Sequence, residues 1–313
     1  MGVLQWHAKP AFFNGNRMAD HTSVSCAMNP GRLWVCQGTP PSGPVMAAAP
    51  GSTAMADCIS TPAAVLGIRD LGGILYGVTG VCHQVANRIL FPSGLIVNAA
   101  RGYRLSSAAF GRFGLNLGFV RARLALQGKF VALIRLKAAV KLFGAVDWVV
   151  KLNACVNVGG DIPPCAPAAG VPLPPPPHTS AEEEQYLTMI TELYEEAFKT
   201  SDSDADSDEA FLTLTFGMPA DEAEERRFMI TEARTKLLAA NADSLAEFLE
   251  NEIDTQHWVE RVNGNFAGFQ SSILEILGPE FYMQNLQIEP GEVMALIDPE
   301  IAAAAYGDEF SVT

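Results

Sequence analysis

Two residues with complementary chemistry, Cys82 and His21, each lie at the expected start of a regular element. Cys82 follows the glycine-punctuated turn 77–80 and opens an expected helix. The free amides and partial positive charge at a helix N-terminus favour the thiolate, which is the nucleophilic form of cysteine. His21 opens an expected strand and is the best-placed base for the thiol proton. The pair predicts attack of a sulfur on a carbonyl carbon, with His21 taking and returning the proton.

A third catalytic side chain is harder to find. Gln37, at the end of the next expected strand, is the only evident polar side chain that could orient the His21 ring. Asp20 is adjacent to His21, but neighbouring side chains on a strand point to opposite faces. His83 would point roughly 100° away from Cys82 around a helix, so we expect it to bond the backbone or line a cleft. The amides of the helix start are the natural donors to an oxyanion.

Each of these residues also has a purely structural interpretation. A cysteine after a glycine-rich turn is often a small buried hydrophobe, and a histidine at a strand start often serves only to hold the fold. Asn87, five residues after Cys82, is interpreted as a structural hydrogen-bonding residue, and Arg88 as a surface cation.

The elements that must position the pair are short. Residues 22–27 and 32–37 are β-prone and are separated by a turn containing proline and glycine at 28–31, which predicts a hairpin. Residues 82–90 have apolar side chains at helical spacing, and Pro92 ends that helix. Mixed strands and helices predict an α+β fold.

This order of a histidine-bearing strand, a second strand and a cysteine that opens a helix is similar to the circularly permuted branch of papain-like hydrolases. That branch includes the NlpC-like and lecithin-retinol-acyltransferase-like proteins. Residues 80–88 also resemble the nucleophile helix of CHAP-type amidases. The resemblance covers about residues 17–95. It implies a small antiparallel sheet with a nucleophile helix, Cys82 as nucleophile and His21 as general base. It also implies hydrolysis or transfer at an amide, thioester or ester bond, with a peptide or amide as the expected substrate.

The chain departs from that family in two ways. No convincing third polar residue accompanies the pair, and a long loop rich in alanine, proline and glycine separates His21 from Cys82.

Composition divides the chain into three parts. Residues 1–160 form the expected thiol hydrolase domain, and the proline-rich stretch 161–179 is an expected semi-rigid linker. Residues 180–313 form an acidic, mainly helical region of the interaction or regulatory type, with helices expected to begin near residue 180 and at Pro219.

Charge separates along the same line. Residues 1–180 contain 15 Lys/Arg against 5 Asp/Glu, a balance of +10, and residues 181–313 contain 6 against 30, a balance of −24. Attraction between the two halves, within the molecule or with a partner, is the simplest use of this split. A solvated basic face, or one that docks on the acidic half, is favoured over a face for a membrane surface or a nucleic acid. The nucleic-acid interpretation is weakened further because few aromatic residues lie among the cations. The rival to an enzyme is therefore a non-enzymatic binding or scaffold protein whose two halves mediate assembly.

The sequence lacks the motifs that would indicate a metal site, a cofactor, a membrane span or secretion. The six cysteines include no CxxC pair and the five histidines no paired spacing, so neither a metal site nor a cofactor is expected. The alternating carboxylates of residues 202–208 lack the glycine and glutamate of a calcium loop. No apolar window is long enough for a transmembrane segment. Without a secretory signal, we expect a cytoplasmic protein, unless it is exported by a non-classical route.

Overall fold

A computed structural model of the chain describes residues 2–13, 16–35, 43–60, 74–115, 120, 123–125, 127–133, 135–136, 213 and 218–297. The linker expected at 161–179, the helix expected from residue 180 and Gln37 lie outside these residues. Within them the chain is mixed α/β, with a small antiparallel sheet followed by a helical C-terminal region.

The sheet has four strands in the order β5-β4-β1-β6, and every neighbouring pair is antiparallel. Residues of β1 alternate between buried and half-buried up to the exposed Lys9, as expected for a strand with one face toward the core. The predicted hairpin is confirmed by the pairing of β4 with β5, but its turn lies at residues 27–28 and not at 28–31, because Asn29 already pairs with Cys26 as the first residue of β5. The strands are β1 (Gly2–Lys9), β4 (His21–Cys26), β5 (Asn29–Val35) and β6 (Val45–Gly51), with a separate short pair, β2 (Phe12–Phe13) and β3 (Asn16–Arg17).

The helices fall into an N-terminal group beside the sheet and a C-terminal group. The expected helix at residues 82–90 is confirmed as α2, and the helix expected at Pro219 begins with Pro219 as its N-cap. The N-terminal group consists of α1 (Thr53–Ser60), α2 (Cys82–Leu90), the 3-10 turn η1 (Phe91–Ser93) and α3 (Tyr103–Phe110). The C-terminal group consists of α8 (Ala220–Leu249), α9 (Thr255–Leu277) and α10 (Pro279–Leu286).

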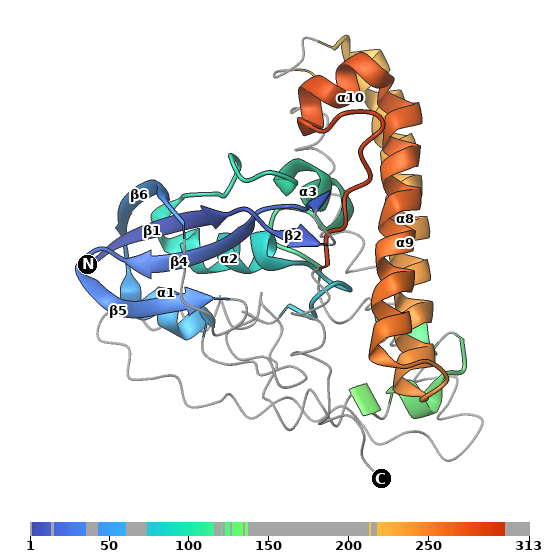
Figure 1. The fold of residues 1–313 in the computed structure, drawn as a ribbon, viewed down its shortest axis with the longest axis horizontal. Coiled ribbons are helices and arrows are strands. Elements are labelled where there is room, and N and C mark those ends of the chain that lie inside the picture. Colours follow the sequence, from blue (N-terminus) through green and yellow to red (C-terminus); the bar gives the residue numbers. More distant parts are fainter. Residues whose placement is uncertain are drawn as a thin grey trace.

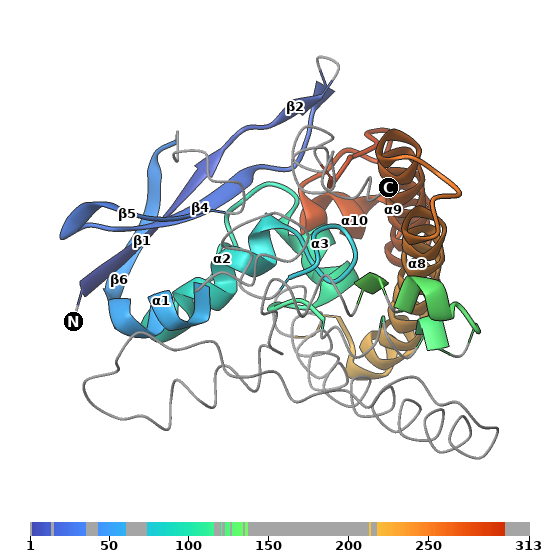
Figure 2. The same ribbon diagram turned by 90° about the horizontal axis from the view of Figure 1, so that it is seen from below.

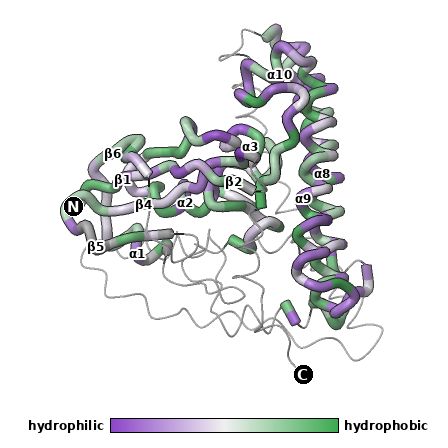
Figure 3. The backbone as a smooth tube through the Cα atoms, viewed as in Figure 1, coloured by the Kyte–Doolittle hydropathy of each residue, from purple (hydrophilic) through white to green (hydrophobic). Residues whose placement is uncertain are grey.

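The sheet and the long helices lie on opposite sides of α2 and α3. In Figures 1 and 2 the sheet is covered on one face by α1 and α2, while α8 and α9 run side by side beyond α3. Figure 3 shows hydrophobic and hydrophilic residues interspersed along α8 and α9, as expected for helices with one buried face. Leu4, Trp6 and Val24 of the sheet and all nine residues of α2 are buried. Helix α2 is therefore central rather than superficial.

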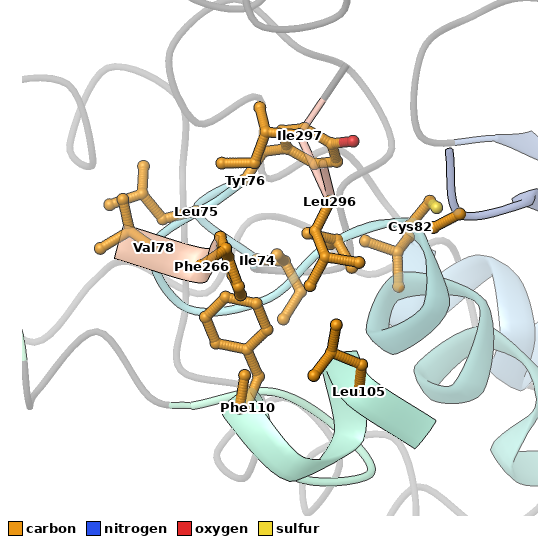
Figure 4. Packing of buried hydrophobic residues seen from close by; sticks show 14 of the residues in the cluster. Ile74, Leu75, Tyr76, Val78, Cys82, Leu105, Phe110, Phe266, Leu296 and Ile297 are labelled. Atoms are coloured by element: carbon orange, nitrogen blue, oxygen red, sulfur yellow. The ribbon is translucent and has the colours of Figure 1, made fainter. Parts of the chain in front are cut away.

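The N-terminal and C-terminal regions share one buried core. The apolar cluster runs without a break from Leu4 in the sheet to Ile297 after α10. Figure 4 shows Phe266 of α9 against Phe110 of α3, whose ring centroids are 5.2 Å apart. Ion pairs between the basic and acidic halves accompany this packing: Arg101 with Glu292, Arg123 with Asp243, and Lys129 with Glu250. Pairs of this partly exposed kind contribute about 0–1 kcal/mol each, so the shared core holds the halves together more than their charges do.

Among the residues that the structure describes, no helix is both long and apolar enough to cross a membrane.

Candidate active site

A tight turn delivers Cys82 to the start of α2. The Gly77 amide donates to the Gly80 carbonyl at 2.8 Å, and the Leu75 amide donates to the Thr79 hydroxyl at the same distance. Gly77 has a φ of 78°, which is costly for any residue with a side chain. The Gln84 side chain then accepts from the Val81 amide at 3.0 Å, completing the cap of the helix. The glycine-punctuated pattern thus specifies a rigid turn with the cysteine as its first helical residue.

Cys82 lies at the corner where α2 meets the start of β4. Its Sγ is 3.8 Å from the backbone oxygen of Asp20, within the range of a thiol hydrogen bond to a carbonyl. The side chain is 4% exposed. Figure 4 shows it at the edge of the apolar cluster that contains Ile74, Leu105 and Leu296. The sulfur is therefore shielded from bulk water but in contact with a polar backbone group.

His83 uses both ring nitrogens inside the protein. Its Nε2 lies 2.9 Å from the Asp20 carbonyl, which can only accept, so Nε2 carries the proton. Its Nδ1 lies 2.8 Å from the Ser106 hydroxyl. Complete burial lowers the pKa of His83 to about 4, although the Asp20 carbonyl opposes this shift. Nearby His21 lowers the pKa further when charged. A neutral ring with Nε2–H cannot take the Cys82 proton through that nitrogen, so His83 is a structural group, as expected from the sequence.

The buried His83 predicts a loss of stability in mild acid. Between pH 6.5 and about 4 the unfolded chain binds a proton at this ring and the folded chain does not, so stability falls as the pH falls. We expect His83→Gln to reduce the loss of unfolding free energy between pH 7.5 and 4.5 by about 2–3 kcal/mol. Denaturant unfolding of both proteins at the two pH values measures this. Equal losses would show that the pKa of His83 does not differ between the folded and unfolded chain.

His21 is the first residue of β4, in the same corner as Cys82. It is half-buried and pairs with Lys9 of β1 in the sheet. It also lies close enough to His83 to affect the pKa of that ring. The structure thus brings the expected base and nucleophile to adjoining element starts. Gln37, the expected orienting residue, lies outside the described residues and stays a prediction.

The Asp20 carboxylate is used for anchoring. Its Oδ2 accepts from the Arg101 amide at 3.0 Å, and its Oδ1 accepts from the Arg17 guanidinium at 3.2 Å. These partners agree with the sequence argument that Asp20 is a poor orienting group for His21. The functional role that sequence reasoning missed is that of its backbone: the Asp20 carbonyl faces both Cys82 and His83.

Two further residues of α2, Asn87 and Arg88, have roles that were predicted from the sequence. Asn87 is a structural hydrogen-bonding residue as predicted: it donates to the Arg112 carbonyl at 2.7 Å and accepts from the Val97 amide at 2.9 Å. The prediction that Arg88 is a surface cation is wrong. Its side chain is 1% exposed and its Nε donates to the Phe113 carbonyl at 2.5 Å. The spacing of apolar residues predicts a helix with one face in solvent, whereas all nine residues of α2 are buried. The Arg88 guanidinium therefore donates to buried backbone carbonyls.

Comparisons with family models, with curated proteins and with solved structures find no match to this chain. Within the described residues, no three His, Cys, Asp or Glu side chains gather in a way that could hold a metal ion.

Proposed function

We propose that this chain is a thiol-dependent hydrolase or acyltransferase of the papain-like type, with Cys82 as nucleophile and His21 as general base. The Cys82 sulfur gives its proton to His21 and bonds to the substrate carbonyl carbon. The amine or alcohol leaves with that proton, and water or an acceptor then releases the acyl group from sulfur. The expected substrate is a peptide or another amide.

One observation supports the proposal most. The 3.8 Å approach of Cys82 Sγ to the Asp20 carbonyl joins the start of α2 to the residue directly before His21. A helix start supplies amides without intrahelical partners, so the amides of Cys82 and His83 are the natural donors to the oxyanion. The proposal therefore assigns nucleophile, base and oxyanion donors to the corner where α2 meets the start of β4.

Because side chains alternate between the two faces of a strand, the position of His21 on β4 limits how its imidazole can approach Cys82 Sγ. Thr22 and Val24 lie on one face of β4, and Val24 belongs to the core that includes α2. His21 shares the other face with Ser23. The proposal therefore requires the His21 ring to reach Sγ around the start of β4, where His21 pairs with Lys9 of β1.

Acetyl transfer from p-nitrophenyl acetate tests the nucleophile. The full chain should release p-nitrophenolate and carry the acetyl group on Cys82, located by peptide mass spectrometry. Cys82→Ala should reduce the release by at least about 100-fold. Cys26→Ala, which removes the other described free cysteine, is the matched control and should leave the rate unchanged. Acetyl groups spread evenly over several cysteines would favour the scaffold alternative instead.

A further inference from the structure

Two hydrogen bonds hold Asp20 against Arg101. The Asp20 amide donates to the Arg101 carbonyl at 3.0 Å, and the Arg101 amide donates to the Asp20 carboxylate at 3.0 Å. The next residue, Gly102, has a φ of 80°, and a methyl group placed there would lie 2.7 Å from the Ala19 Cβ. The chain before His21 is therefore held on a specific, closely packed turn.

The Arg101 side chain points from this turn to the C-terminal region. Its guanidinium donates to the Gln287 carbonyl at 3.3 Å and forms an ion pair with Glu292. Both partners follow the body of α10 and lie 186 and 191 residues later in the sequence. One residue thus joins Asp20 to the acidic half of the chain.

The segment that receives Arg101, residues 287–297, is itself fixed. Gln270 of α9 donates to the Glu292 carbonyl at 2.5 Å and accepts from the Met294 amide at 2.9 Å. At its end, Ile297 packs on the turn before Cys82, since a methyl group on Gly77 would lie 2.3 Å from the Ile297 Cδ1. The 287–297 segment therefore contacts both loops that meet at the Cys82 corner.

We propose that Arg101 is a positioning residue for the Cys82–His21 pair, and that Glu292 of the acidic half holds it in place. This inference rests on the proposed function. It assigns the helical C-terminal region an indirect part in the reaction, because the 287–297 segment sets the spacing of the two element starts. Asp20, whose carbonyl accepts from the Cys82 thiol, is also bonded to Arg101 through its carboxylate.

The test compares Glu292→Gln with Asp243→Asn in the full chain. Both remove one ion pair between the two halves, but only the Glu292 pair leads to Asp20. We expect Glu292→Gln to slow iodoacetamide labelling of Cys82 at pH 7 by about tenfold, because small misplacements of reacting groups cost up to about 100-fold. The pH at which labelling is half-maximal should also rise. Asp243→Asn should change neither quantity, and the melting temperatures of both variants serve to exclude unfolding.

Arg101→Gln and the double variant complete the experiment. If the two side chains act as one unit, the double variant loses no more than Arg101→Gln alone. Suppose that Cys82 is labelled equally fast in wild type and in Glu292→Gln, while the half-maximal pH still shifts when His21 is replaced. This result would overturn the positioning role of Arg101 and leave the proposed function intact. A wild-type Cys82 that labels no faster than other cysteines would overturn the proposed function itself.

Discussion

Trp258→Ala will lower the free energy of unfolding by about 3–5 kcal/mol, the range for removing a large buried aromatic side chain. Trp258 is fully buried on α9 and packs against Phe248 of α8, with ring centroids 5.7 Å apart. It also reaches the turn before Cys82, since a methyl group on Gly77 would lie 3.5 Å from its Cη2. Denaturant unfolding measures the loss, which should occur in a single transition because both regions share the core.

Phe228→Ala is the control for that experiment. Phe228 is an aromatic residue of α8 that is 63% exposed, so its removal should change the free energy of unfolding by less than about 0.5 kcal/mol. Two separate transitions in wild type, with only one of them moved by Trp258→Ala, would contradict a shared core.

His21→Asn will slow acetyl transfer to Cys82 by about 100- to 10,000-fold, the usual contribution of a general base. Asparagine keeps a polar group at the start of β4 but cannot take the thiol proton. His257→Asn is the matched control, because His257 is 64% exposed on its side chain and lies on α9. The initial rate of p-nitrophenolate release measures both variants. If His21→Asn released p-nitrophenolate as fast as wild type, His21 would not be the base that takes the Cys82 proton.

Local signals in the sequence were enough to place α2 and the β4–β5 hairpin. Helix α2 is defined by three local features that need no reference to the rest of the chain. These are the glycine-containing turn before Cys82, the helical spacing of apolar residues and Pro92 at the end. The burial of Arg88 could not be found in this way. It depends on residues 112–115 closing over α2, and neither propensity nor periodicity encodes such long-range packing.

In the candidate site too, some features follow from the local sequence and others only from the tertiary fold. The chemistry of Cys82 and His21 follows from residue type and from their places at element starts. The Asp20 carbonyl was missed because every residue carries a carbonyl, and only the tertiary fold selects this one. Gln84 had a local signal, since glutamine at the third helical position is a capping residue. Ser106 and Glu292 lie 23 and 191 residues from their partners His83 and Arg101, so no sequence pattern connects them.

The most direct measurement is the pH dependence of iodoacetamide labelling at Cys82 in the wild-type protein, followed by peptide mass spectrometry. The account predicts selective labelling that is half-maximal well below pH ~8.5, the value for an ordinary free thiol. Slow labelling that rises only above that pH, at the same rate as for Cys26, would show that the sulfur is a buried packing group and not a nucleophile.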